Sequence, residues 1–222
     1  MSSGEIGAEA RSLRPPDRVA ALFAEHYPPG HPARDILWQH SAAVASLSLE
    51  IGQAQGARLD FLEEAAWLHD IGIAYTHAPG IGCFGDRPYL CHGVIGRELC
   101  EQAGFPEHGR VCETHVGTGL TEAEVQATGL PLPVRDMLPV SLEEQVVCYA
   151  DQFFSKSSSD RLDLAEVRRR VGRHGEAPLR RFEALHSRFG KAAGGQKKQI
   201  SAAGDRRLGP AQAARSGAVA ES

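Results

Sequence analysis

The sequence predicts an all-α protein with one globular domain. Between residues 15 and 189 the apolar residues recur at intervals of three and four, which is the periodicity of an amphipathic helix. Clusters of proline and glycine separate these segments, and none of them sustains the apolar and polar alternation of a half-buried strand. With 222 residues, of which 42% are hydrophobic, the chain can enclose one core but not two full-sized ones.

Proline bounds the first two predicted helices. One begins at Asp17 and ends before Pro28, and Pro32, at a first-turn position, begins the next. The second helix carries a stripe expected to be buried, in which a histidine stands among apolar residues at spacings of four, four, three and four: Ile36, His40, Val44, Leu47 and Ile51.

The remaining elements follow from the same pattern. A third helix runs from residue 59 or 60 to the pair His69-Asp70, and the Gly- and Pro-rich residues 72–91 are expected to form a long ordered loop. Further helices are predicted near 92–103, 106–116, 121–128 and 141–156, and an arginine-rich helical part near 163–189.

Both ends of the chain have the composition of disordered segments. Residues 1–14 are expected to be a disordered leader and residues 190–222 a disordered tail, since they contain few large apolar side chains, which leaves residues 15–189 as the domain. No apolar run reaches the roughly 18 residues of a membrane span, and the N-terminus lacks the apolar stretch of a secretory signal. A cytoplasmic protein without membrane contact is expected.

Charge and cysteine content exclude some classes of protein. The net charge is −4, and because residues 190–222 hold six Lys/Arg against two Asp/Glu, residues 1–189 carry −8. This acidic body argues against a broad nucleic-acid-binding surface, and the run Arg168-Arg169-Arg170 is better explained as a solvated helix face. Five cysteines without a CxxC pair favour reduced core residues over a disulfide framework. The sequence specifies no oligomeric state.

Six histidine and aspartate residues form the main functional signal. Five of them are expected inside helices with apolar neighbours, so that each polar group points inward. One such histidine alone is more often a hydrogen-bonded core residue than a ligand. Burying six together, at roughly 1–3 kcal/mol for each unsatisfied group, indicates a shared partner such as divalent metal ions. The six are, in order, His40, His69, Asp70, His92, His115 and Asp151.

This pattern resembles the HD superfamily, whose signature is H…HD…H…H…D on an all-helical bundle. The resemblance extends from about Asp17 to Phe189, and Leu68-His69-Asp70-Ile71-Gly72 reproduces the H-D-I-G form of the central motif. The family's one-metal members lack the two middle histidines, so their presence here favours the two-metal subtype. The resemblance implies one ion held by His40, His69, Asp70 and Asp151, and a second ion, bridged by Asp70, held by His92 and His115.

The implied site predicts a metal-dependent phosphohydrolase. Two ions about 3.5–4 Å apart can share a bridging hydroxide and stabilise charge on an attacked phosphorus. The expected substrate is a small phosphate ester or anhydride, such as a nucleotide or related metabolite. Four imidazoles with two carboxylates suit iron, manganese, cobalt, nickel or zinc better than magnesium.

Asp70 and Lys156 are the expected catalytic residues. Lys156 follows Asp151 by five residues, near the end of a predicted helix, and this D-x-x-x-x-K arrangement looks like one that contacts the substrate phosphate in HD hydrolases. A solvated lysine is the equally weighted alternative.

Two arginines are further candidates for substrate binding. Arg87 lies in the loop that leads to His92, where it either reaches the site or forms a structural pair with Asp86. Arg135, in a proline-rich connection, either belongs to a lid or pairs with Asp136.

Other interpretations remain open at this point. An HD subgroup uses a mixed-valence di-iron centre with the same six ligands to oxidise C–P or C–C bonds. A non-enzymatic metal protein is less favoured, because a structural site needs neither a bridging carboxylate nor open coordination positions. His77 and Cys83 are extra ligands or pocket lining, and the other histidines are expected at the surface: His26, His31, His108, His174 and His186.

Overall fold

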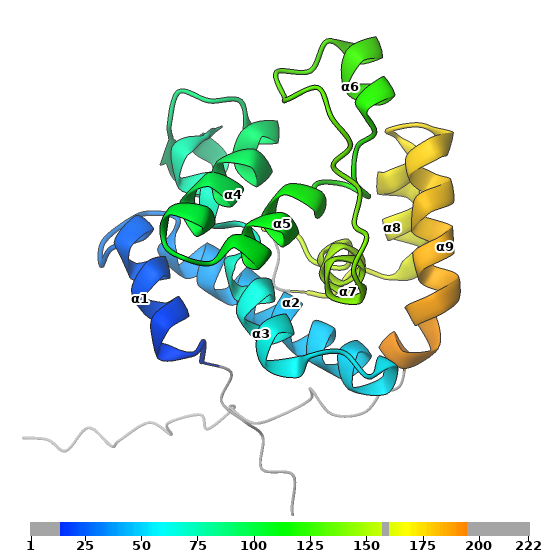
Figure 1. Ribbon diagram of the computed structural model, residues 1–222, viewed down its shortest axis with the longest axis horizontal. Helices are drawn as coiled ribbons and strands as arrows, with labels where there is room; N and C mark the ends of the chain where they lie inside the picture. The colour runs from blue at the N-terminus through cyan, green and yellow to red at the C-terminus, as the bar shows by residue number, and fades with distance from the viewer. Residues whose placement is uncertain (1–13, 157–159, 195–222) are drawn as a thin grey trace, which may run out of the picture.

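The computed structural model describes residues 14–156 and 160–194, and these residues are mainly helical, as the sequence predicts (Figure 1). Most of the predicted leader and tail lies outside the described residues. The described part contains nine α-helices: α1 (Asp17–His26), α2 (Arg34–Gln55), α3 (Leu59–Leu68), α4 (His92–Gln102), α5 (Pro106–Thr114), α6 (Glu122–Thr128), α7 (Leu142–Asp151), α8 (Leu164–Gly172) and α9 (Glu176–Ala193).

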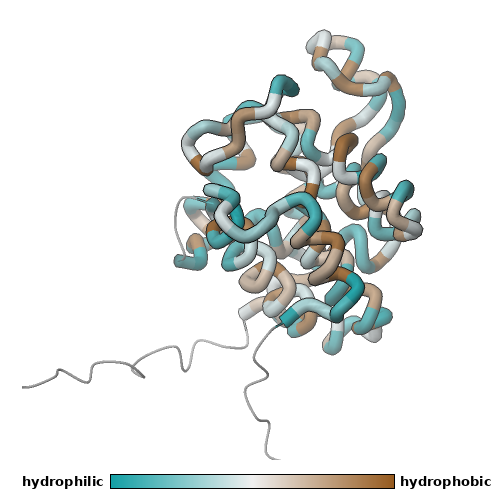
Figure 2. The backbone as a smooth tube through the Cα atoms, turned by 90° about the vertical axis from the view of Figure 1, so that its left-hand side faces the viewer, coloured by the Kyte–Doolittle hydropathy of each residue, from teal (hydrophilic) through white to brown (hydrophobic). Residues whose placement is uncertain are grey.

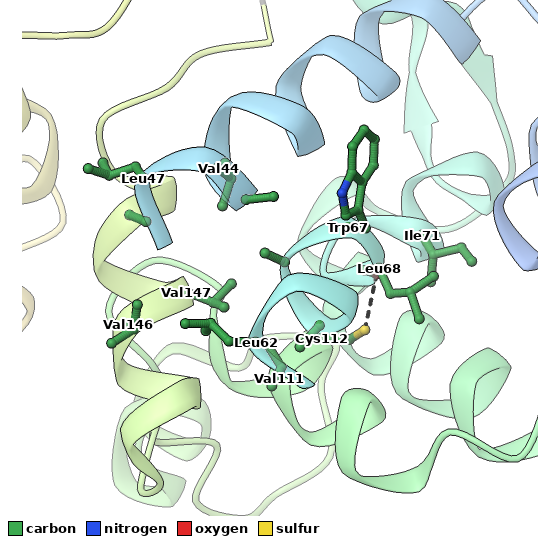
Figure 3. Packing of buried hydrophobic residues seen from close by; sticks show 14 of the residues in the cluster. Val44, Leu47, Leu62, Trp67, Leu68, Ile71, Val111, Cys112, Val146 and Val147 are labelled. Carbon is green, nitrogen blue, oxygen red and sulfur yellow. Dashed lines mark hydrogen bonds between the residues drawn. The ribbon is translucent and has the colours of Figure 1, made fainter. Parts of the chain in front are cut away.

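Helix α2 is central, because it packs against α3, α7 and α9. Figure 3 shows Val44 and Leu47 of α2 near Val146 and Val147 of α7 and Leu62 of α3, and all five side chains are buried. Fully burying a side chain of this size contributes roughly 1.5–3 kcal/mol. The shared core therefore fixes the relative positions of the three helices, and with them the polar residues that the helices carry.

The segment between α3 and α4 is ordered, as predicted, and contains short elements. It begins with a 3-10 helix that packs against α4. A two-stranded antiparallel hairpin follows, with His77 opposite Phe84 and Ala78 opposite Cys83. The elements are η1 (Ile71–Tyr75), β1 (His77–Ala78), η2 (Pro79–Ile81), β2 (Cys83–Phe84) and η3 (Tyr89–Cys91).

Two predicted boundaries were wrong. Helix α7 ends at Asp151 rather than near residue 156, because the next amides bond three residues back: Phe153 N–H donates to Ala150 O and Phe154 N–H to Asp151 O. Such bonds tighten the last turn and end the helix. At the other end of the domain, α9 continues through Ala193, which is buried, so helical structure extends four residues beyond the predicted boundary at 189.

The segment that carries α6 extends away from the bundle (Figure 1). A bridge between Leu120 and Met137 closes its base, and Arg181 of α9 binds Glu124 of α6 at 3.0 Å. Figure 2 shows polar and apolar residues interspersed along the backbone. Within residues 14–156 and 160–194, no helix has both the length and the apolarity of a membrane span.

Candidate metal centre

The structure brings the six predicted ligand residues together, but mostly at helix ends rather than inside helices as expected. Only His40 lies in the interior of a helix, α2. His69 caps the end of α3 and Asp70 follows it, whereas His115 caps the end of α5. The others are the first residue of α4, His92, and the last residue of α7, Asp151. The pattern of apolar neighbours in the sequence indicated which side chains point inward. It did not show where each helix ends.

Three of the four histidines are oriented by the same local contact. In each, Nδ1 lies 2.7 Å from the backbone carbonyl oxygen three residues earlier: His69 with Ala66, His92 with Tyr89, and His115 with Cys112. Because a carbonyl only accepts, Nδ1 must carry the proton. A neutral ring then leaves Nε2 with a free lone pair, which is the tautomer that a metal ion requires.

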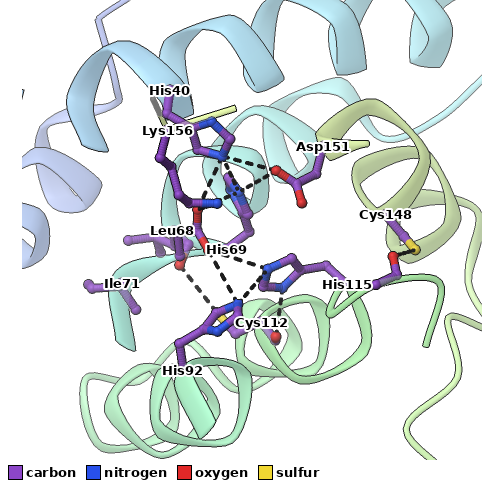
Figure 4. Close-up of polar contacts among 12 residues, drawn as sticks. His40, Leu68, His69, Ile71, His92, Cys112, His115, Cys148, Asp151 and Lys156 are labelled. Atoms are coloured by element: carbon purple, nitrogen blue, oxygen red, sulfur yellow. Dashed lines mark hydrogen bonds and ion pairs between the residues drawn. The ribbon is translucent and has the colours of Figure 1, made fainter. Parts of the chain in front are cut away.

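Asp70 lies between two pairs of histidines. Its Oδ2 is 3.1 Å from Nε2 of His40 and of His69, whereas its Oδ1 is 3.5 Å from Nε2 of His92 and 3.4 Å from Nε2 of His115. Figure 4 shows His40, Lys156 and Asp151 in one part of the cluster and His92 and His115 in another. Each oxygen of one carboxylate thus faces a different histidine pair.

The donor atoms form two groups that share Asp70. The first contains His40, His69, Asp70 and Asp151, and the second contains Asp70, His92 and His115; within each group the atoms lie within 4.8 Å of one another. The closest pairs, such as His40 Nε2 and Asp151 Oδ1 at 2.9 Å or His92 Nε2 and His115 Nε2 at 3.2 Å, match ligand spacings around one ion. Ligands at 2.0–2.1 Å from a metal are about 2.9 Å apart in octahedral and about 3.3 Å apart in tetrahedral geometry.

Several buried polar atoms of the described residues lack a hydrogen bond of normal geometry, which also fits a bound cation. Oδ1 of Asp70 and Oδ1 of Asp151 are buried without a hydrogen bond of normal geometry to any described residue. Their closest neighbours are the imidazole nitrogens of the cluster. Because an unsatisfied buried oxygen costs roughly 1–3 kcal/mol, and more when charged, these residues fit divalent ions of the imidazole-binding kind.

Burial and neighbouring charges shift the pKa values of Asp70, His69 and His92 strongly. Burial raises the pKa of Asp70, but the charges of Lys156 and His69 outweigh it and hold this pKa well below its usual range. Burial lowers the pKa of His69, yet the carboxylates of Asp70 and Asp151 raise it to about 10. Burial dominates at His92 and lowers its pKa to about 4, so that this ring is neutral at pH 7.

Lys156 reaches the cluster from the turn after α7. Its Nζ lies 2.6 Å from Oδ2 of Asp70, and the side chain is only 16% exposed. On a continuous helix, a residue five positions after Asp151 would point about 140° away from it. The end of α7 at Asp151 therefore allows the contact. Burial lowers the pKa of Lys156, but Asp70 and Asp151 raise it well above its usual range, so that the amine stays charged.

Two residues outside the cluster hold the backbone beside Asp70. The hydroxyl of Tyr27, a fully buried residue after α1, lies 3.3 Å from the carbonyl oxygen of Asp70 and accepts a hydrogen bond from Ala74 N at 2.9 Å. Gly72 permits close packing, because an added Cβ there would lie 2.1 Å from the carbonyl oxygen of His92 and 2.5 Å from Gly96 N. These contacts link the H-D-I-G segment to α1 and α4.

No described contact brings the two arginine candidates into the cluster. The exposed Arg87 pairs through its backbone, with its carbonyl accepting from His77 N at 2.7 Å. Arg135 pairs with the fully buried carboxylate of Glu113 rather than with Asp136, which instead accepts from Glu122 N. Their predicted roles in substrate binding gain no support from these contacts.

The other histidines and cysteines lie outside the two donor groups. His77 is exposed on β1, and all five cysteines are free and buried, as predicted. The prediction of a surface position was wrong for His108, which is buried with Nε2 3.0 Å from Glu64. Glu64 also pairs with Arg18, so this histidine belongs to a structural network of α1, α3 and α5.

Comparisons with known proteins bear on this cluster. A family model described as the HD domain matches residues 37–154, a range that includes all six residues. An uncharacterized protein of Methanocaldococcus jannaschii is 31% identical over 144 residues, which are 61% of this chain and 78% of that protein. No solved structure matches the chain significantly.

Two tRNA (cytidine(56)-2′-O)-methyltransferases are also similar over part of their length. The protein of Thermoplasma volcanium is 30% identical over 136 residues, 61% of this chain and 36% of that protein. That of Picrophilus torridus is 27% identical over 124 residues, 55% of this chain and 33% of that protein. The similarity therefore covers about a third of each methyltransferase.

Proposed function

The chain belongs to the HD domain family, and from that premise we propose that it is a phosphohydrolase with two divalent metal ions. The substrate is a small phosphate ester or anhydride, and the ions are held by the six residues of the cluster. The observation that carries the proposal is the position of Asp70, whose two oxygens face separate histidine pairs. One carboxylate can bridge two ions only in such an arrangement.

Each residue of the cluster has a defined task in this proposal. When bound, the ions supply Lewis acidity and activate a water molecule for attack on phosphorus. The carbonyl contacts of His69, His92 and His115 fix their rings, so little reorganisation is needed on binding. Asp151, at 15% side-chain exposure against 1% for Asp70, marks the side of the centre that a substrate approaches.

Lys156 is the proposed electrostatic catalyst. Its charged amine, 2.6 Å from Asp70, lies beside the centre without being a metal ligand. Negative charge builds on the non-bridging phosphate oxygens during attack, and a fixed ammonium in a water-poor site stabilises it. Because the amine is already positioned and charged, it contributes to the transition state without a change in protonation.

The relatives do not extend the proposal to methyl transfer. The match covers about a third of each methyltransferase, and the six-residue cluster provides metal donors rather than a methyl-donor site. Residues 1–189 carry a net negative charge, so we still expect no broad nucleic-acid-binding surface. A small phosphorylated substrate is therefore the proposed partner.

The test is phosphate release from a panel of nucleotides and sugar phosphates with manganese, cobalt, nickel or iron, without oxygen. Lys156→Met, which keeps the volume but removes the charge, should retain the wild-type metal content and lose roughly 100-fold in kcat. Equal kcat values for the wild type and Lys156→Met would show that Lys156 has no catalytic role. The same assay repeated with iron in air tests the alternative, because activity that appears only with iron and dioxygen would replace the hydrolase by the mixed-valence di-iron oxygenase.

A further inference from the structure

A pocket of about 360 Å³ lies beside the cluster. Its walls come from three parts of the chain: the elements β1, η2 and η3 between α3 and α4, the turn after α7, and helix α8. This volume lies within the roughly 300–1,000 Å³ of small-molecule sites. A bare phosphate would leave most of the space unfilled.

The pocket borders the metal centre through two residues. Lys156 lines it and contacts Asp70, as described above. Tyr89 also lines it, and its ring centroid is 4.8 Å from that of His92. A phosphate bound between the cluster and Lys156 would therefore extend its organic part into this pocket.

The lining has a defined chemical character. Two aromatic side chains, Tyr89 and Phe154, and the aliphatic Ala78 and Ile81 provide apolar surface. Tyr89 remains 40% exposed, although the described part of the chain buries most of its large apolar residues. Exposed aromatic surface in a pocket favours a planar ring system, because stacking on aromatic side chains adds to the burial of apolar area.

A second cation, Arg170 of α8, lines the pocket. Its Nε donates to Glu166 at 2.7 Å, and Arg169 pairs with the same carboxylate. One carboxylate between two guanidinium groups leaves an excess positive charge. The side chain is 43% exposed, so it is accessible to a ligand. Arg170 thus lies on the solvated helix face that the sequence predicts, and it also lines the pocket.

We propose that this pocket binds the organic part of the substrate, with a planar ring against Tyr89 and Phe154 and a second anionic group at Arg170. The inference rests on the proposed hydrolase and names its substrate class as nucleoside phosphates that carry a further phosphate. Arg170 is then a specificity-determining residue. The reacting phosphate lies at Lys156.

Binding of non-hydrolysable probes to the metal-loaded protein tests this proposal by calorimetry. The probes are methylphosphonate, a nucleoside 5′-phosphonate, and the same phosphonate with a second phosphate on its ribose. The nucleoside should improve binding over methylphosphonate by about tenfold, as expected for one stacked base. The second phosphate should add about three- to fivefold, the usual effect of an exposed ion pair.

Gly80 allows a pocket-filling variant that leaves the fold intact, because an added Cβ there has no atom within 4 Å. Gly80→Phe should abolish the gain from the nucleoside and keep methylphosphonate binding, whereas the matched Gly80→Ala should bind like the wild type. Arg170→Gln should lose the gain from the second phosphate. Arg168→Gln, which removes an exposed arginine of the same helix that pairs with Glu183 and does not line the pocket, should keep it.

Two outcomes would overturn the inference: equal binding of methylphosphonate and the nucleoside phosphonate by the wild type, or undiminished nucleoside binding by Gly80→Phe. Equal effects of Arg168→Gln and Arg170→Gln would overturn the assignment of Arg170. Failure of the proposed function would be seen in a different measurement. If no substrate in the panel released phosphate, the proposed hydrolase activity would be wrong, even if the probes bound as expected.

Discussion

Asp70 differs from the other five residues of the cluster, since each of its carboxylate oxygens faces a different pair of histidines. Every other residue in the cluster belongs to one donor group only. Substitutions at single positions should therefore separate a shared ligand from ligands of one ion.

Asp70→Ala should lose both metal ions, because the residue contributes a donor atom to each group. His92→Ala should lose only the second ion, since the first group keeps all four of its donors. Elemental analysis of the purified variants gives the equivalents bound. Two equivalents in His92→Ala, or one fully occupied site in Asp70→Ala, would contradict the bridge.

Metal binding to the first group should release a proton. The carboxylates of Asp70 and Asp151, acting against burial, raise the pKa of His69 to about 10, so the metal-free ring is protonated at pH 8. A ligand must be deprotonated, so affinity for the first ion should rise up to tenfold per pH unit below pH 10. Calorimetry in buffers of different ionisation enthalpy measures the proton, and identical heats in all buffers would argue against it. His92, with its pKa lowered to about 4, should release none on binding the second ion.

Among the secondary-structure elements, the contact between η1 and α4 positions the two donor groups relative to each other. It depends on glycine, because an added Cβ at Gly72 would approach the carbonyl oxygen of His92 to 2.1 Å. The backbone of one element here meets the ligand-bearing end of another. A methyl group at this contact would move His92 away from Asp70.

Gly72→Ala should reduce the free energy of unfolding by about 1–3 kcal/mol, the usual effect of overpacking a filled site. It should also weaken binding of the second ion more than the first. Gly80→Ala is the matched control, expected within about 0.5 kcal/mol of wild type because its Cβ meets nothing within 4 Å. Urea denaturation measures the free energy of unfolding of both variants. Equal free energies for Gly72→Ala and Gly80→Ala would show that η1 and α4 can move apart at little cost in stability.

In the whole molecule, α9 closes the bundle by packing against α2 and α7. Its final turn is part of the packed structure, because Ala193 is buried and its carbonyl oxygen accepts from Arg161 at 2.9 Å. The predicted domain boundary at residue 189 therefore cuts through an ordered helix.

Two truncations should separate the helix from the residues that follow it. A chain that ends at Gly194 should melt within about a degree of the full chain, because residues 195–222 contain few large apolar side chains. A chain that ends at Phe189 should melt several degrees lower, since it loses the packing of Ala193 and the bond from Arg161. Differential scanning calorimetry of the two truncated chains and the full chain measures these melting temperatures. Identical melting temperatures would show that the last turn contributes nothing.

The sequence predicted the helical class and the gathering of the six residues, because both follow from periodicity and from the cost of burying polar groups. It did not predict where helices end, since the turn after Asp151 depends on bonds from Phe153 and Phe154 that leave no clear pattern. The buried position of His108 was missed because its partner, Glu64, is 44 residues away. Arg170 was missed because its pocket joins segments distant in sequence.

The location of five cluster residues at helix ends has a consequence for how such a protein can change over evolution. A helix anchored at one end by a metal donor can gain or lose turns at its other end without displacing that donor. The connection at Gly104, between α4 and α5, lies at the ends of these helices away from His92 and His115. Whole turns inserted there would lengthen both helices outward without displacing His92 or His115 from the cluster.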